Sequence, residues 1–294
     1  MIATLSKRPR GSPRGRFFLV SNPKKEHVEM ISHDSLTQAS TSGLGYEQHG
    51  AGPECVLVMH DWLGDHTSYE SVMPYLDGAA FTYVFVDLRG YGKSIHMRGD
   101  YNVQEIAADC LKLADKLGWH RFHLIGHSMT GMATQRIAAD APDRIKSAIA
   151  VCPISAAGNQ LNEEALRFFS STCENDDAFR RLVRFVTGGL SDQWANVKLR
   201  QNRERVAPEC RSGYLEMLST THFVEDVRGL ETPYLLIIGE KDPGLDEHAM
   251  KNTFLAWHPN AKLLKIPNCG HYPMQECPPY FAMVIENFLR TQVR

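Results

Sequence analysis

The sequence predicts an α/β fold, in which a mostly parallel twisted sheet carries helices on both faces. Two observations support this prediction. From about residue 44, short runs rich in Val, Ile, Leu and Phe recur along the chain, and helical patterns separate them. Near-continuous apolar runs are typical of parallel strands that are buried on both faces, and a regular alternation of strand and helix indicates an open sheet.

Six runs have the length and composition of buried strands. Each is mostly apolar and lies between turn residues or helical patterns, as parallel strands do. In chain order they cover Cys55–Met59, Thr82–Val86, Phe122–Ile125, Ser147–Val151, Tyr234–Ile238 and Lys262–Ile266.

Three helices are expected between the early strands. Thr67–Glu70 (TSYE) has the spacing of a capping box, in which the first and fourth side chains bind the backbone N–H groups that open a helix. Val103–Leu117 is strongly periodic, and Met129–Asp140 forms a third helix. The third is expected to end where Ala141-Pro142 follows, because a proline disfavours helix at the preceding residue.

The alternation breaks between about residues 155 and 227, where the pattern is helical and no strand run occurs. Such an insertion is expected over the carboxyl ends of the strands, where open sheets bind ligands. We therefore predict a loosely ordered basic extension over 1–27, a core over 28–154 and 228–294, and a helical cap over 155–227. Large apolar residues of the cap are interpreted more as packing than as pocket residues, namely Phe168, Phe169, Phe179, Phe185, Trp194, Tyr214, Met217 and Phe223.

Composition excludes several classes of protein. The chain has 294 residues, 43% apolar and 22% charged, and no apolar run is long enough to span a bilayer. Residues 1–25 hold seven Lys and Arg and no acid, which leaves 25 basic against 34 acidic residues in the rest. A body this acidic is a poor nucleic-acid partner. The seven scattered Cys favour a reducing compartment. We expect a cytoplasmic protein, with organelle targeting by the basic arm left open.

Three residues that follow strands have the chemistry of a nucleophile, a base and an acid. Ser128 lies in Gly126–Gly131 (GHSMTG), between a strand and a helix, as a nucleophile elbow requires. A serine needs a base, and His271 follows the last strand. Asp242 follows the preceding strand, with Glu240 and Asp246 as nearby rivals for the acid. The carboxyl ends of parallel strands meet at one edge, so we expect these side chains to converge.

Together these motifs resemble the α/β-hydrolase superfamily over residues 44–292, and in particular its esterase-like serine hydrolases with a helical lid. The family places its triad in this chain order. Four further segments match its motifs: His60–Gly64 (HDWLG) its oxyanion loop HGxxG, Asp87–Ser94 its DxRGxGxS turn, Ala141–Arg144 its APDR step, and His271–Pro278 its GHxPxxExP ending.

The resemblance implies a serine hydrolase that cleaves a carboxylic ester or lactone through an acyl-enzyme, with no cofactor and no metal. It implies catalytic Ser128, Asp242 and His271, and an oxyanion hole formed by the backbone N–H groups of Trp62 and Met129. His60, Asp61 and His127 are expected to support the loop and the elbow. A small-molecule ester or lactone is the expected partner, and the oligomeric state is left open.

Two positions depart from the family pattern. Thr130 and Asp61 stand where the family usually has Gly. A β-branched Thr130 is expected to crowd the elbow. The Asp61 carboxylate would oppose an oxyanion unless it turns away, and we favour a turned-away side chain that holds the loop through an Asx-type bond to a backbone N–H.

Other functions remain open at this point. The C–C bond hydrolases of aromatic ring breakdown use the same triad, although they usually carry Trp where this chain has Tyr272. Hydrolase-like receptors and signalling proteins of this fold turn over slowly. Cofactor-free dioxygenases are a third class. Two weak motifs are set aside: Gly92–Ser94 lacks the first Gly of a P-loop, and His60, Asp65 and His66 lack the spacing of a metal site.

Overall fold

The sheet has seven strands in the order β1-β3-β2-β4-β5-β6-β7, in a computed structural model that describes residues 43–293. The expected extension over 1–27 and the start of the expected core, 28–42, lie outside these residues. β1 pairs with β3 antiparallel, and every other pairing is parallel. The strands are β1 (Tyr46–His49), β2 (Glu54–Met59), β3 (Phe81–Val86), β4 (Phe122–His127), β5 (Ile145–Val151), β6 (Tyr234–Gly239) and β7 (Ala261–Ile266).

The predicted fold class is confirmed, and so are the six predicted strands. Each real strand is one or two residues longer than its apolar run. β1 was not predicted, because its sequence YEQH is polar and its side chains are half-buried or exposed. An antiparallel edge strand needs only one covered face, so it lacks the apolar run that marks the inner strands.

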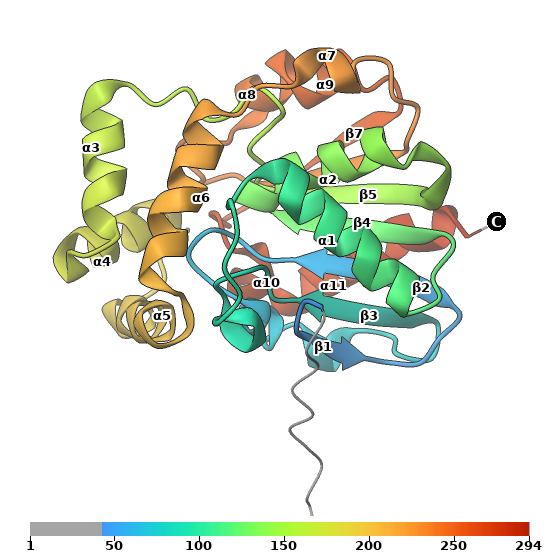
Figure 1. Ribbon diagram of the computed structural model, residues 1–294, viewed down its shortest axis with the longest axis horizontal. Coiled ribbons are helices and arrows are strands. Elements are labelled where there is room, and N and C mark those ends of the chain that lie inside the picture. Colours follow the sequence, from blue (N-terminus) through green and yellow to red (C-terminus); the bar gives the residue numbers. More distant parts are fainter. Residues whose placement is uncertain (1–42, 294) are drawn as a thin grey trace, which may run out of the picture. The chain divides into compact units, whose positions relative to one another are not determined.

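Helices cover both faces of the sheet (Figure 1). Along β2, Leu57 and Met59 pack into one apolar cluster with the helices α1 and α2, whereas Val56 and Val58 pack into a second cluster with α11. This alternation is the two-residue period of a strand that is buried on both sides. The covering helices are α1 (Val103–Lys116), α2 (Met129–Asp140), α8 (Glu247–Asn252), α9 (Phe254–Trp257), α10 (Pro273–Glu276) and α11 (Pro278–Thr291).

The expected helix start at Thr67–Glu70 is wrong. The residues His66–Tyr69 form a short 3₁₀ helix, η1, and Asp65 caps it by accepting the Thr67 N–H at 3.0 Å. Asp65 takes the capping position predicted for Thr67, because its carboxylate reaches the backbone N–H group two residues further along the chain. Three further 3₁₀ turns are η2 (Met73–Tyr75), η3 (Gly92–Ser94) and η4 (Pro142–Arg144).

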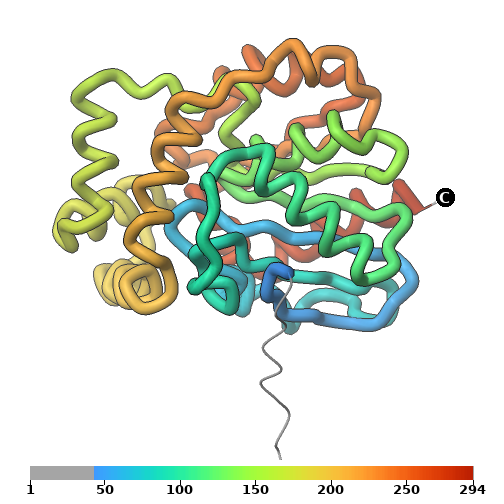
Figure 2. Tube along the Cα trace, in the orientation of Figure 1, coloured from blue at the N-terminus to red at the C-terminus, as the bar shows by residue number. Residues whose placement is uncertain are grey.

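Residues 155–227 contain helices and contribute no strand to the sheet. Figure 1 shows α3 to α6 grouped at the end of the sheet where β2 and β4 finish, and Figure 2 shows the trace leaving after β5 and returning to form β6. Asn162, Asn175 and Ser191 cap three of these helices through their side chains. The helices are α3 (Glu163–Thr172), α4 (Asp176–Val186), α5 (Asp192–Arg205), α6 (Pro208–Thr220) and α7 (Val224–Val227).

The last of these, α7, lies within the predicted cap but packs on the core helix α2. Its Val224 and Val227 belong to the same apolar cluster as α1 and α2. Within residues 43–293, no helix has both the length and the apolar character needed to cross a membrane.

We predict that Gly131→Ala destabilises the fold. Gly131 lies in the first turn of α2, and a Cβ there would come 2.2 Å from the Cβ of Pro153 in the loop after β5. Overpacking of this kind costs about 1–3 kcal/mol, which outweighs the gain of about 1 kcal/mol in helix propensity. Urea unfolding followed by circular dichroism measures the difference.

Gly244→Ala is the matched control, because a Cβ at that position meets nothing within 4 Å. It should unfold at the same urea concentration as the wild type. A Gly131→Ala protein as stable as the wild type would contradict the close packing of α2 on the β5 loop.

Candidate active site

Ser128 occupies the sharp turn between β4 and α2. Its backbone angles are φ 55° and ψ −112°, a strained conformation for a residue with a side chain. Hydrogen bonds fix the turn: Ser128 N–H donates to the Val151 carbonyl at 2.9 Å, and the Ser128 carbonyl accepts from Gly131 and Ile154. A Cβ at Gly126 would lie 2.3 Å from the Thr130 carbonyl oxygen, so this flank of the turn requires glycine.

His271 and Asp242 form a buried pair at the ends of β7 and β6. His271 Nδ1 donates to Asp242 Oδ2 at 2.6 Å, and the other carboxylate oxygen accepts the Gly244 and Leu245 N–H groups. The rival acids have other partners. Glu240 accepts the Asn268 N–H, and Asp246 caps α8. Of the three acids considered, the structure brings only Asp242 to His271.

The pair shifts both protonation equilibria. Burial lowers the pKa of His271, but the charge and the hydrogen bond of Asp242 outweigh burial and raise that pKa above its usual value. Burial raises the pKa of Asp242, but His271 and the Gly244 and Leu245 N–H groups lower it further, so the carboxyl titrates below its usual range. With Nδ1 bound to Asp242, Nε2 of His271 remains to receive a proton.

Ser128, Asp242 and His271 line one cavity of about 310 Å³. Ser128 makes no hydrogen bond with His271 or with any other described side chain, although both residues line this space. Catalytic hydrogen bonds are often long before substrate binds. Most of the wall is apolar. Of the eight large cap residues interpreted mainly as packing, three line the cavity: Phe168, Phe169 and Phe185.

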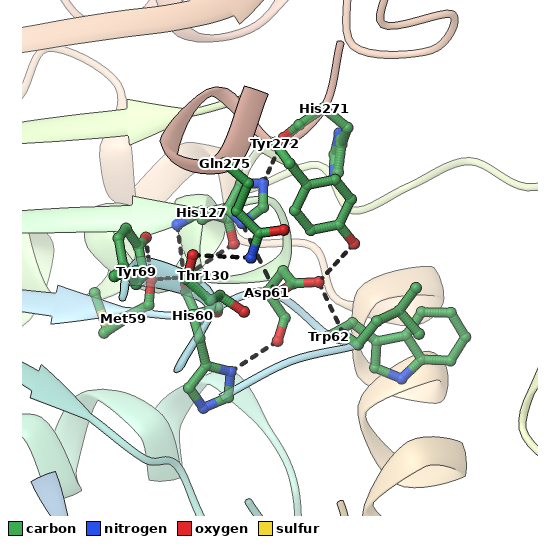
Figure 3. A network of polar contacts seen from close by, with 12 residues as sticks. Met59, His60, Asp61, Trp62, Tyr69, His127, Thr130, His271, Tyr272 and Gln275 are labelled. Carbon is green, nitrogen blue, oxygen red and sulfur yellow. Dashed lines mark hydrogen bonds and ion pairs between the residues drawn. The ribbon is translucent and has the colours of Figure 1, made fainter. Parts of the chain in front are cut away.

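Hydrogen bonds to its backbone carbonyl groups hold the loop His60–Gly64, and Figure 3 shows the first of them, from His60 to Asp61. The Asp61 carbonyl accepts His60 Nδ1–H at 2.7 Å, and the Trp62 carbonyl accepts the Tyr91 hydroxyl at 2.8 Å. The Leu63 carbonyl accepts the side-chain amide of Asn202 on α5 at 3.0 Å. Each of these carbonyls therefore has a donor from a side chain, as buried polar groups require.

Two backbone N–H groups, one of a residue that lines the cavity and one of the residue that follows Ser128, have no acceptor among residues 43–293. They belong to Trp62, in this loop, and to Met129, the first residue of α2. Trp62 and Ser128 both line the cavity, and the helix dipole of α2 favours negative charge at its N-terminus. Free N–H groups in such a place can bind an oxyanion.

Asp61 is buried with its carboxylate ionised. Oδ2 accepts the Leu63 N–H at 3.1 Å, which is an Asx-type bond, and the Tyr272 hydroxyl at 2.9 Å. Burial raises the pKa of Asp61, but the charge of the Lys198 ammonium and the hydrogen bond of the Tyr272 hydroxyl lower it, and the pKa lies far below the usual range. The bond favoured from the sequence is present, and the Tyr272 hydroxyl is a partner that the sequence did not reveal.

His127 and Thr130 tie the elbow to the other loops. Burial lowers the pKa of His127 to about 3, so the ring is neutral, and its Nε2–H donates to the His271 carbonyl at 2.7 Å. Its approach to Asp61, 3.9 Å, is therefore not an ion pair. Thr130 Oγ1 accepts the His127 N–H at 2.9 Å and lies 2.9 Å from the His60 carbonyl. Thr130 thus links two strand ends and does not merely crowd the turn.

One group outside the cavity has metal-ligand composition. Carboxylate and imidazole atoms of Asp65, His66 and Asp87 lie within 4.8 Å of one another, and His60 is not among them. His66 Nδ1 binds Asp87 Oδ2 at 2.7 Å, and Asp65 binds Thr67 and Arg205. These atoms already form hydrogen bonds and an ion pair within the protein. This arrangement fits a hydrogen-bonded turn better than a set of metal ligands.

The chain belongs to the α/β-hydrolase fold family, whose model matches residues 54–276. It is 25% identical over 254 residues, 83% of this chain, to the dihydrolipoyllysine-residue acetyltransferase component of the acetoin cleaving system of Pseudomonas putida. It is also 25% identical over 255 residues to a pimeloyl-[acyl-carrier protein] methyl ester esterase of Nitrosomonas europaea, covering 80% of this chain and 95% of that one.

The relatives differ in length. The match spans 66% of the Pseudomonas putida protein, and a Cupriavidus necator protein of the same name is 33% identical over 110 residues, 37% of this chain and 29% of that protein. Among solved structures, a bromoperoxidase from Bacillus anthracis superposes with a TM-score of 0.76 at 22% identity, covering 84% of this chain and 95% of that chain. This likeness shows the shared fold.

We predict that Asp242→Asn lowers the pKa of the His271 ring. The carboxylate charge and its hydrogen bond stabilise the imidazolium, so their loss leaves burial as the dominant effect. An NMR titration that follows the His271 ring nitrogens measures the shift and needs no substrate. Glu240→Gln is the matched control, because Glu240 binds Asn268, and it should leave the His271 pKa unchanged. An equal shift in the control would assign the acid to Glu240.

Proposed function

We propose that this chain is a serine hydrolase that cleaves a carboxylic ester or a lactone with an apolar acyl group. One observation carries the proposal: a strained serine and a histidine paired with a buried carboxylate line one apolar cavity. Trp62, which also lines it, and Met129, which directly follows the serine, have backbone N–H groups without an acceptor among residues 43–293. The relative named a methyl ester esterase supports the reaction class. No step needs a cofactor.

The first half-reaction acylates Ser128. His271 Nε2 takes the hydroxyl proton while Ser128 Oγ bonds to the substrate carbonyl carbon, and Asp242 stabilises the imidazolium. The N–H groups of Trp62 and Met129 bind the oxyanion of the tetrahedral intermediate. Collapse of that intermediate breaks the bond to the leaving oxygen, which receives the proton from His271 and departs as the alcohol.

The second half-reaction returns the enzyme to its starting state. His271 takes a proton from a water molecule, whose oxygen bonds to the acyl carbon. The second tetrahedral intermediate then expels Ser128 Oγ, which regains the proton, and releases the carboxylic acid. In a lactone the leaving alcohol stays joined to the acid, so one hydroxy acid is released.

The cavity wall favours an uncharged, apolar group on the substrate. Leucine and phenylalanine side chains from residues 155–227 form much of it, which supports the proposal that this region acts as a cap over the site. An anionic acyl chain would lose its hydration against this apolar wall and is therefore disfavoured. The apolar residues contributed by this region are Leu161, Phe168, Phe169, Leu182, Phe185, Val186 and Leu218.

We expect Ser128→Ala to abolish ester hydrolysis. The substitution removes the nucleophile, and losses in comparable triads reach about 10⁴–10⁶ in kcat. A fluorophosphonate should label the wild-type protein on Ser128, as located by mass spectrometry, and should leave Ser128→Ala unlabelled. Full activity in Ser128→Ala, or an adduct on another residue, would refute the mechanism. Labelling of Ser128 with only very slow turnover would favour the receptor alternative.

We also expect a rise in kcat/KM along p-nitrophenyl esters from acetate toward decanoate, followed by a limit. Each methylene buried in the cavity contributes about 0.8 kcal/mol, which corresponds to about fourfold per methylene, until the space is filled. The hemisuccinate ester should be a poor substrate. Leu182→Phe narrows the cavity and should move the optimum to shorter chains, whereas Leu182→Met, of similar volume, should not. An unchanged optimum in Leu182→Phe would place the acyl chain elsewhere.

A further inference from the structure

Lys198 is a fully buried lysine on the cap-region helix α5, with 2% of its side chain exposed. Its Nζ donates to Ser68 Oγ at 3.1 Å and lies 3.6 Å from Asp61 Oδ1. It also lies 4.7 Å from the centre of the Tyr272 ring. A buried ammonium is costly unless a counter-charge faces it, and Asp61 is that counter-charge.

Helix α5 presents a polar face to the oxyanion loop and the turn after it. Lys198, Asn202 and Arg205 follow one another at spacings of four and three residues, which places them on one side of the helix. Lys198 reaches Asp61, Asn202 binds the Leu63 carbonyl, and Arg205 pairs with Asp65. The loop therefore depends on α5 both for its hydrogen bonds and for its charge balance.

Close to Lys198, two buried acceptor atoms make no hydrogen bond with any of the described residues. They are Asp61 Oδ1, which has only the charge of Lys198 nearby, and His127 Nδ1, and they lie 3.9 Å apart. The His127 ring donates through Nε2, so its Nδ1 can only accept. Gly64 keeps this spot open, because a Cβ there would come 2.5 Å from Lys198 Nζ and 2.8 Å from Asp61 Oδ1.

We propose that Lys198 is a positioning residue: its charge neutralises Asp61, so that the carboxylate can hold the oxyanion loop without opposing the oxyanion itself. The carboxylate fixes Leu63 N–H and the Tyr272 hydroxyl, and Trp62 lies between the two ends of that Asx turn. Without Lys198, an uncompensated negative charge would line the cavity that holds Ser128. The inference rests on the proposed serine hydrolase function.

A pH profile separates this role from a merely structural one. The charge of Asp61 contributes to raising the pKa of His271. Removal of the Lys198 charge should therefore raise that pKa further, and removal of the Asp61 charge should lower it. The pH at which His271 becomes a competent base shifts with it. The titratable or charged groups around His271, Asp61 and Lys198 are Asp242, Glu276, His127, His60, Tyr272, Cys152, Tyr69 and Tyr91.

The experiment compares Lys198→Met, Asp61→Asn and the double variant on the best ester found. Lys198→Met should lower kcat by about 10–100-fold, less than the roughly 10²–10³-fold loss when a whole oxyanion donor is removed. It should also move the rising limb of the kcat profile up by roughly 0.5–1 pH unit. Asp61→Asn should move that limb down, and the double variant should return it to the wild-type position. Arg200→Met removes an exposed cation from the same helix and should change neither quantity.

The outcomes are distinguishable. If Lys198→Met fails to fold, the double variant, which replaces the ion pair with neutral groups, still serves: its profile must lie above that of Asp61→Asn alone. Coincident profiles of those two variants, or a Lys198→Met profile like the wild type, would overturn the inference. Refutation of the proposed serine hydrolase function is a separate result, because Ser128→Ala would then keep full activity.

Discussion

Parallel pairing around β4 is the constraint on which the site depends. Since β2, β4, β6 and β7 run in one direction, the residues that follow them arrive at one edge of the sheet. His60, Ser128, Asp242 and His271 each lie within a few residues of such a strand end. The hydrogen bond from Ser128 N–H to the Val151 carbonyl continues the β4–β5 ladder into the elbow, so the strained turn is stabilised by the sheet itself.

A second constraint is that polar backbone groups and the Asp61 carboxylate are buried at this edge of the sheet. The loop after β2 cannot use sheet pairing, so side chains from three places satisfy it: His60 within the loop, Tyr91 after β3, and Asn202 on α5. In this orientation of the loop, the Trp62 N–H group has no acceptor within the part of the chain that the structure describes. A buried N–H group without a partner is unfavourable in the resting protein, and binding an oxyanion there would remove that cost.

The sequence predicted the elements that have strong local patterns. It did not predict the features that depend on contacts between distant parts of the chain. Apolar runs marked the inner strands, and three strand-end residues marked the candidate triad. The polar edge strand Tyr46–His49 carries no such pattern. At Thr67 the predicted capping box does not form, because Asp65 caps the short helix instead. The partnership of Asp61 with Tyr272 joins positions 211 residues apart, so no local spacing could reveal it. No local pattern singles out Lys198 either, since its burial depends on how α5 packs against the loop.

The two departures from the family pattern belong to one network (Figure 3). Thr130 Oγ1 accepts the His127 N–H and lies close to the Met59 and His60 carbonyls, so it joins the end of β4 to the start of the oxyanion loop. One residue further on, Asp61 closes the same loop through Leu63 and Tyr272. A glycine at either position would leave buried backbone groups without these partners. These side-chain hydrogen bonds make the loop rigid, which the proposed role of Trp62 as an oxyanion donor would require, because a misplacement of about 1 Å can cost about 100-fold in rate.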